Sequence, residues 1–564
     1  MALLKRYSPF CFVLLHALVL ASTSVGQTFD EKFDVWPVDL KINGRIIVDN
    51  GAQNFEGMER FFNLISKNKK TVFFYASDST DPTKLFAEMK ARMGENGTIE
   101  RIPFDEFPTD KLKEALGAAD VVGIYAKAGF QAESKSLQKL KNDFDRFIYK
   151  QGSLIVNRSI AESLGNYVLK KAADGQRHQI EPGLNLIPDC VLLCGAENSK
   201  PSKDDLLTVL SKHPRSVGIG LENATILMLS GRKMTCYGEG TATFMLPANS
   251  HTPLRVQTIM SGQTPGHRIT RYLLDLTEWR RDAIDRTISR FPPAEPKPPM
   301  VDNGALVIVG GGGMPSGLMD RFIELAGGKE KAQLVYVPCS EQGQVRSVQS
   351  TVEAWKKMGV VNATFVHTKD RNKANNDKTF MAPLKNATGI WFGGGRQWNF
   401  ADSYYGTTSH KLMKEVLHRG GVIGGSSAGA SIQARYLARA TPIENYRIMA
   451  PGYERGGLGF LSGVAIDQHF SQRGRQKDMT QLVNRYPQLL GIGLDEATAI
   501  IVQKSKAEVL GRGKAHFYDR NLPVTSGKPD FIALPTGSSY DLVKRKVLVD
   551  TTKPPAEADE KEMK

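Results

Sequence analysis

The stretch GGVIGGSSAGA, residues 420–430, decides the fold of the second half of the chain. It places Ser427 between a short apolar strand and a helical segment, and every near neighbour of that serine is small. A sharp strand-to-helix turn holds a nucleophile in a strained conformation and aims its hydroxyl out of the sheet, so only small residues fit beside it. The pattern predicts a nucleophile elbow, with the amide of Ala428 pointing at the developing oxyanion. A glycine-rich turn around a structural serine is the alternative interpretation.

Short apolar strands alternate with helical patterns around this turn. We predict strands at 306–309, 334–337 and 422–423, and helices at 317–325 and 410–417. Strands without polar alternation that are separated by helices favour a parallel sheet covered on both faces. The predicted fold class is α/β, with two tandem doubly wound parallel-sheet domains.

A serine nucleophile needs a base and a partner that orients the base. Residues 467–470, DQHF, follow an apolar run and put His469 at a strand end. Residues 491–499, GIGLDEATA, put Asp495 and Glu496 at the end of another strand. Because the carboxyl ends of parallel strands converge on one sheet edge, we expect these side chains to meet Ser427 there.

The first half of the chain repeats the pattern of the second, with an offset that grows slowly, as loop insertions in a tandem duplication would produce. Chance similarity between two α/β domains is the alternative. The clearest matches pair residues 58–61 with 319–322, 123–125 with 389–391, and 218–221 with 491–494.

The first half lacks the chemistry of the second. Ser159 aligns with Ser427 and Gln131 with Gln397, but Asn157, Arg158, Ile160 and Ala161 crowd the turn that requires small residues. No base aligns with His469, and Asn223 aligns with Glu496. We therefore predict that residues 30–290 form a degenerate, non-catalytic copy.

The ends of the chain and its middle predict the remaining boundaries. Residues 1–26 have basic residues, an apolar run and a small-residue end, which is typical of a secretory signal peptide and predicts a secreted or periplasmic protein. An uncleaved N-terminal anchor is the alternative interpretation. A proline-rich linker at 291–303 precedes a catalytic domain at 304–550, and 551–564 has the composition of a disordered tail.

Composition excludes several classes of protein. The net charge is +15, but Lys and Arg are spread over the whole length without a nucleic-acid-binding motif, so we expect no nucleic-acid partner. No further apolar segment could span a membrane, which argues against an integral membrane protein. The glycine run 310–313 lacks the G-x-G-x-x-G spacing of a dinucleotide-binding site. We expect it to allow close backbone packing at the active-site edge. No histidine pair has metal-ligand spacing, so neither metal nor cofactor is expected.

Four motifs in order, GGRQ at 394–397, GSSAGA at 425–430, DQHF at 467–470 and GLDE at 493–496, resemble the cyanophycinase family of serine peptidases. These are relatives of the aspartyl dipeptidases on a class I glutamine-amidotransferase-like fold, and the resemblance covers residues 304–545. It implies Ser427 as nucleophile, His469 as general acid/base and Glu496 as the orienting carboxylate.

The resemblance also implies a substrate pocket. Gly394 and Gly395 would complete the oxyanion hole with Ala428. The predicted substrate-binding residues are Gln397, Asp467, Gln468, Arg473 and Arg475. Two departures, Asp478 at a basic position of the family and Arg396 before the glutamine, put specificity for β-aspartyl-arginine in doubt.

The predicted function is a serine-type peptidase that hydrolyses cyanophycin or related aspartyl (iso)peptides through an acyl-enzyme. An amidotransferase is disfavoured because that chemistry uses a cysteine at the elbow. An esterase on an α/β-hydrolase fold is disfavoured because the acid of its triad precedes the histidine in the chain, whereas Glu496 follows His469. A non-catalytic peptide- or polymer-binding protein is the alternative from another class. The predicted partner is a peptide or cyanophycin-like polymer, and the two halves could mimic a homodimer within one chain.

Overall fold

The computed structural model describes residues 36–552, apart from 38–39, 41, 53, 56–57, 77–82, 128–133, 172–177, 197–198, 262–272, 342–344, 346–347 and 444–446. Residues from Trp36 onward form one compact unit. The predicted signal peptide, nearly all of the predicted tail, and Gln131 lie outside the described residues.

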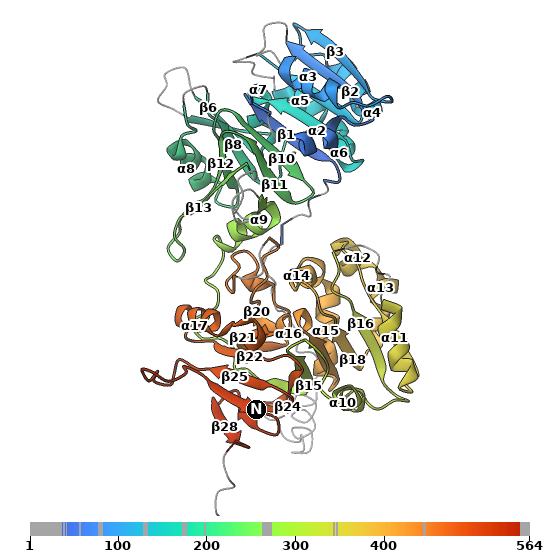
Figure 1. Cartoon of the computed structure of the whole chain (residues 1–564), viewed down its shortest axis with the longest axis vertical. Helices are drawn as coiled ribbons and strands as arrows, with labels where there is room; N and C mark the ends of the chain where they lie inside the picture. Colours follow the sequence, from blue (N-terminus) through green and yellow to red (C-terminus); the bar gives the residue numbers. More distant parts are fainter. Residues whose placement is uncertain are drawn as a thin grey trace, which may run out of the picture. The chain divides into compact units, whose positions relative to one another are not determined.

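A nine-stranded mixed sheet forms the framework of the second half, in the order β17-β16-β18-β19-β15-β23-β24-β27-β28 (Figure 1). The strands from β17 to β15 are parallel, and those from β23 to β28 are antiparallel to their neighbours. Their bounds are β15 Val301–Val309, β16 Gln333–Val337, β17 Asn362–Phe365, β18 Gly389–Phe392, β19 Val422–Ser426, β23 Thr498–Lys504, β24 Lys506–Gly511, β27 Ser539–Asp541 and β28 Lys546–Val549.

Helices cover the parallel part of this sheet because alternate residues of its strands point to opposite faces. Phe322 of α10 and Trp355 of α11 pack in one apolar cluster with Val307 of β15. α15 also contacts β15. The helices are α10 Leu318–Leu325, α11 Val348–Lys357, α12 Arg371–Asn376, α13 Lys378–Asn386, α14 Trp398–Tyr404, α15 Thr408–His418, α16 Ala428–Ser431 and α17 Gln476–Arg485.

A second sheet in this half has the order β20-β21-β22-β25-β26, of which β20, β21 and β22 are parallel. It comprises β20 Ala434–Tyr436, β21 Leu461–Gln468, β22 Leu490–Leu494, β25 Lys514–Tyr518 and β26 Ile532–Pro535. β21 and β22 are buried along most of their length, and they end at the DQHF and GLDE motifs. The two motifs are therefore adjacent, as parallel pairing of the two strands requires.

The first half repeats the order of the first eight strands of the nine-stranded sheet, as β3-β2-β4-β5-β1-β10-β11-β14, and has a second sheet in the order β7-β6-β8-β9-β12-β13. Its strands are β1 Arg45–Asn50, β2 Lys70–Ala76, β3 Thr98–Phe104, β4 Val121–Tyr125, β5 Ser153–Asn157, β6 Tyr167–Lys171, β7 His178–Pro182, β8 Cys190–Cys194, β9 Val217–Leu221, β10 Thr225–Ser230, β11 Lys233–Gly238, β12 Thr241–Leu246, β13 Arg255–Met260 and β14 Leu273–Asp275. Its helices are α2 Glu59–Ser66, α3 Thr83–Ala91, α4 Thr109–Ala118, α5 Ser134–Lys139, α6 Lys141–Tyr149, α7 Arg158–Ala161, α8 Lys203–Lys212 and α9 Leu276–Asp285.

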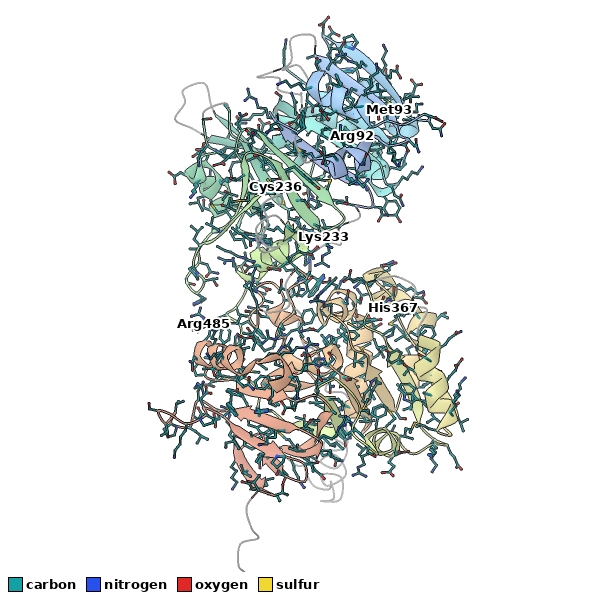
Figure 2. The ribbon with its side chains drawn as sticks, viewed as in Figure 1. Arg92, Met93, Lys233, Cys236, His367 and Arg485 are labelled. Atoms are coloured by element: carbon teal, nitrogen blue, oxygen red, sulfur yellow. The ribbon has the colours of Figure 1, made fainter. Side chains whose placement is uncertain are left out.

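Each half has its own hydrophobic core. The largest cluster of the first half includes Val156, Leu192 and Cys236, the last of which is marked in Figure 2. In the second half, one cluster lies between the parallel strands and helices α10 and α11, and another lies between β21 and α17. Polar contacts join the halves, among them the ion pair of Arg232 with Asp402 of α14.

The sequence correctly predicted the mixed α/β class and the parallel strands, but not the whole sheet arrangement. Each half contains two sheets, and the antiparallel strands that follow β9 and β22 were missed. They were missed because a strand such as β23, with the sequence TAIIVQK, carries the same apolar run as a parallel strand. Within the described residues, no helix is long and apolar enough to cross a membrane.

Candidate active site

Ser427 lies at a strained turn between β19 and α16. Its backbone has φ 56° and ψ −111°, a conformation that L residues rarely adopt and that costs about 1–3 kcal/mol. The small neighbours are required by space. A Cβ atom at Gly425 would lie 2.4 Å from the carbonyl oxygen of Gly429, and one at Gly429 would lie 2.1 Å from that of Phe392. The turn thus has the geometry of a nucleophile elbow.

His469 and Glu496 meet Ser427 at the sheet edge. The Oγ atom of Ser427 lies 3.0 Å from Nε2 of His469, and Nδ1 of His469 lies 2.5 Å from Oε1 of Glu496. The carboxylate can hold the Nδ1–H tautomer, which leaves Nε2 free to accept the serine proton. These three side chains come from turns that follow β19, β21 and β22, so a chain of donors and acceptors runs across three strand ends.

The glycine run at 310–313 makes room for the imidazole and the carboxylate. A Cβ atom at Gly311 would lie 2.5 Å from the His469 ring, and one at Gly312 would lie 2.4 Å from the Glu496 carboxylate. The amide of His469 also donates to the carbonyl of Gly310 at 2.8 Å. This is the close packing at the active-site edge that the sequence indicated for the run.

We expect Gly311→Ala to lower kcat/KM about 100-fold, since a displacement of about 1 Å can cost that much. The added methyl group would push the His469 ring away from Ser427. Gly317→Ala is the matched control, because Gly317 also has a positive φ but nothing within 4 Å of its Cβ position. Kinetics of both variants, with melting temperatures, give the comparison. Equal activities of the two variants would show that the imidazole does not need this space.

Burial lowers the pKa of His469, and the nearby charges of Arg473 and Arg475 lower it further, while the hydrogen bond to Glu496 acts in the opposite direction. A base must be neutral to accept a proton. Because its pKa is lowered, His469 stays neutral, and can act as a base, at lower pH than an ordinary histidine.

The pH profile should report this shift. We expect kcat/KM to rise with pH and to reach half of its plateau below pH 6.5, the ordinary value of a histidine. Arg473→Gln removes one positive charge beside the imidazole, so its midpoint should move to higher pH. Arg321→Gln, at an exposed position on another helix, serves as the control. An unchanged midpoint in Arg473→Gln would refute the electrostatic link.

The predicted oxyanion residues border the nucleophile. Ala428 begins α16 directly after Ser427. A Cβ atom at Gly394 would lie 3.6 Å from Cβ of Ser427, so this glycine lies beside the nucleophile. A Cβ atom at Gly395 would instead lie 3.0 Å from Sγ of Cys339. Burial raises the pKa of the Cys339 thiol to about 12, so this sulfur is a neutral packing group.

The predicted substrate residues differ in where their side chains lie. Gln397 is buried and donates its amide hydrogens to the carbonyls of Ala438 and Arg439, at 2.8 and 2.7 Å. Gln468 is buried as well, and Arg473 is exposed. The Gln397 side chain therefore links its own loop to the loop that contains Ala438 and Arg439, whereas the sequence predicted that Gln397 lines the pocket beside the serine.

Asp467 and Arg475 belong to a buried ion network. Nη1 of Arg475 lies 2.9 Å from Oδ1 of Asp467, and Nε of Arg439 lies 2.9 Å from Oδ2. Nη2 of Arg439 also contacts Asp478 at 2.7 Å. The structure thus places Arg475 on an internal carboxylate and not in the exposed position expected of a substrate anchor. Asp478, the departure from the family's basic cluster, has an internal partner of its own.

A second polar cluster holds the turn that follows His469 against the turn that contains Glu496. Oδ1 of Asp495 accepts hydrogen bonds from the Ser471 amide at 3.0 Å and from Nε2 of His516 at 3.2 Å. Oε1 of Gln472 accepts from the Glu496 amide at 2.9 Å. The sequence marked Asp495 only as one of two carboxylates. His516 and Gln472 carried no motif that would have revealed them.

The same edge of the first half is built differently. Ser159 lies inside α7, and none of residues 157–161 has a positive φ, so the strained elbow is absent there. The buried side chain of Asn50 donates to the carbonyls of Gly195 and Leu221, both at 3.1 Å. It ties together the ends of β8 and β9, the strands that correspond in sheet order to β21 and β22.

Part of the second half is similar to known peptidases. The profile of Peptidase family S51 matches residues 306–510. A cyanophycinase from Geminocystis herdmanii is 27% identical over 204 residues, which are 36% of this chain and 74% of the relative. A cyanophycinase from Trichormus variabilis is 25% identical over 200 residues, or 34% of this chain and 65% of the relative. The chain thus spans about two thirds to three quarters of these relatives.

One solved structure, of a peptidase from an acI-B1 actinobacterium, is 24% identical and covers 42% of this chain and 97% of its own, with a TM-score of 0.32. In the described part of the chain, no group of three or more His, Cys, Asp or Glu side chains could hold a metal ion. The matched region contains the strained serine, the histidine and the glutamate. Over residues 306–510 this chain is similar to the cyanophycinase-like peptidases of family S51.

Proposed function

We propose that the chain is a secreted serine-type peptidase that hydrolyses cyanophycin or related aspartyl (iso)peptides, with its active site in the second half. The observation that supports this most strongly is the pair of hydrogen bonds that link Ser427 to His469 and His469 to Glu496, with Ser427 at a strained elbow. A structural serine in a glycine-rich turn would need neither the strained φ nor an aligned imidazole.

The chemistry proposed for this site is acyl transfer. His469 takes the proton of Ser427 as Oγ attacks the substrate carbonyl, and Glu496 stabilises the imidazolium that forms. The amide of Ala428, with the Gly394 loop, would stabilise the oxyanion. His469 then gives its proton to the leaving amine, which departs and leaves an acyl-enzyme. Water, deprotonated by His469, hydrolyses the ester and restores Ser427.

We propose that the first half is a degenerate duplicate that supports the catalytic half. The order of eight strands that the two main sheets share supports a duplication. The contacts of Arg232 indicate that the first half stabilises the second. Its guanidinium lies 4.7 Å from the centre of the Trp398 ring and forms an ion pair with Asp402. Both partners lie on α14, which begins directly after Gln397. The two halves would then replace the homodimer of a single-domain enzyme.

The test is release of β-aspartyl-arginine from cyanophycin by the purified protein without residues 1–26, alongside labelling by a serine-reactive fluorophosphonate. Release together with labelling at Ser427 would establish a cyanophycinase. Labelling without release would direct the search to other aspartyl peptides. Neither labelling nor release, in a folded protein, would overturn the enzyme proposal and favour a binding protein.

A further inference from the structure

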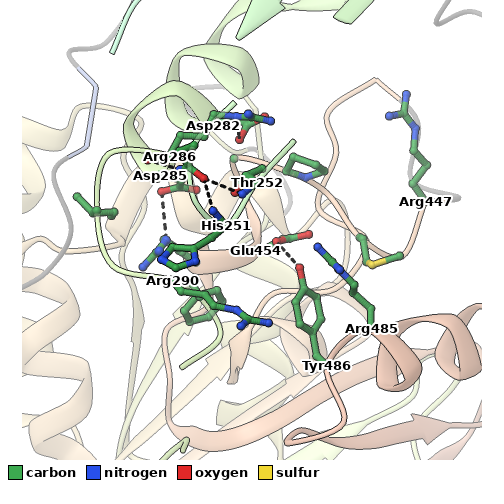
Figure 3. Close-up of a pocket in the computed structure, with 17 residues that line it drawn as sticks. His251, Thr252, Asp282, Asp285, Arg286, Arg290, Arg447, Glu454, Arg485 and Tyr486 are labelled. Carbon is green, nitrogen blue, oxygen red and sulfur yellow. Dashed lines mark hydrogen bonds and ion pairs between the residues drawn. The ribbon is translucent and has the colours of Figure 1, made fainter. Parts of the chain in front are cut away.

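A polar pocket of about 400 Å³ lies apart from the candidate active site, because none of the proposed catalytic residues lines it (Figure 3). Its walls come from the loop after β12, the end of α9 with the segment that follows it, residues 447–455, and the end of α17. The aromatic rings of Phe291 and Tyr486 form part of the lining. The pocket therefore combines apolar surface with charged groups from both halves of the chain.

Five arginines contribute to this lining, and two of them are neutralised by carboxylates of the pocket. Nε of Arg286 lies 3.2 Å from Asp282, and Nε of Arg455 lies 3.4 Å from Asp285. The other three are Arg290, Arg447 and Arg485.

Arg290 and Arg485 provide the excess positive charge. Both are exposed, and among the described residues neither forms an ion pair with a carboxylate. Figure 3 shows them on different sides of the pocket, with Arg485 beside Tyr486. The one further carboxylate of the lining, Glu454, lies 3.5 Å from the Tyr486 hydroxyl, and burial raises its pKa to about 7. Near neutral pH the pocket therefore has more positive than negative charge.

We propose that this pocket binds a carboxylate-bearing segment of a peptide, with Arg290 and Arg485 as its anchors. The planar guanidinium group presents paired donors that match a carboxylate, and the two rings can pack against the peptide between the anchors. The net charge of +15 would favour the approach of such an acidic ligand. This inference rests on the proposed peptidase function, because it makes the pocket a remote subsite for the substrate.

The pocket is joined to the catalytic network through main-chain hydrogen bonds. The amide of Leu437 donates to the carbonyl of Glu454, and that of Arg439 to the carbonyl of Ile448, both at 2.9 Å. Arg439 in turn holds Asp467, two residues before His469. A peptide bound in the pocket would therefore contact the segment 447–455, which is hydrogen-bonded to the loop that contains Arg439. Arg439 binds Asp467 beside the catalytic histidine.

The experiment measures binding of a fluorescein-labelled hexa-aspartate peptide to full-length Ser427→Ala protein, by anisotropy at about 50 mM salt. We expect Arg290→Ala/Arg485→Ala in that background to weaken binding at least 10-fold. The control double variant, Arg146→Ala/Arg321→Ala, removes the same charge from side chains that are 64% and 50% exposed elsewhere, and it should change affinity less than 2-fold. All four arginines are exposed, so melting temperatures should stay close to that of the parent.

Two results would overturn the inference. One is that the acidic peptide does not bind, and the other is that both double variants weaken binding equally, which would indicate general surface attraction. Because binding is measured without Ser427, it does not depend on the acyl-enzyme chemistry. Failure of fluorophosphonate labelling with retained pocket binding would therefore remove the proposed function and leave the binding site in place.

Discussion

Ser427→Ala should abolish fluorophosphonate labelling and lower the rate of peptide hydrolysis by about 10⁴-fold or more, while Ser159→Ala leaves both unchanged. Removal of the nucleophile eliminates the covalent route and leaves only the contribution of binding and oxyanion contacts. Ser159 aligns with Ser427 in the repeat, but it lies within α7 and has no strained backbone. The pair of variants therefore compares the same substitution at the two corresponding turns.

Intact-mass measurement after labelling, with progress curves for hydrolysis, gives both readouts. The alanine at 427 removes only a hydroxyl at a half-buried position, so the melting temperature should change little. Substantial residual hydrolysis in Ser427→Ala that disappears on adding Ser159→Ala would contradict the assignment and show that the first half is catalytic.

The catalytic edge could be predicted from the sequence because its determinants are local. The small residues around Ser427 specify the elbow, and parallel strand pairing brings the turns after β21 and β22 side by side. Once those strands are recognised, the approach of His469 and Glu496 follows from topology. The glycines at 311 and 312 were visible as a run, and their purpose followed from the edge on which they lie.

The partners of the buried charges could not be predicted in the same way. Arg475 follows Asp467 by eight residues, but the same carboxylate also binds Arg439, which a separate loop supplies. Gln397 is similar, because its amide bonds to carbonyls of the same loop. A motif specifies which side chains are present. Whether a polar side chain faces the substrate or the interior depends on the segments that fold over it, and those carry no periodic signal.

The buried network around Asp467 should matter as much for stability as for catalysis. We expect Asp467→Ala to reduce the free energy of unfolding by about 3–5 kcal/mol, because it leaves the guanidinium groups of Arg439 and Arg475 buried without their shared carboxylate. Urea unfolding monitored by tryptophan fluorescence and by circular dichroism measures the change. Activity should fall as well, since Asp467 lies two residues before His469 on the same strand end.

Asp478→Ala is the matched control, because it removes another carboxylate from the same arginine. The Asp478 side chain is 36% exposed, whereas that of Asp467 is fully buried, so water can replace part of what is lost. Its cost should be within about 1 kcal/mol, as for an exposed ion pair. If the two variants had equal stabilities, the network would be a surface feature. If Asp467→Ala kept full stability but lost activity, the carboxylate would act on the substrate or on His469. The sequence-based assignment of Asp467 to the substrate pocket would then replace its structural role.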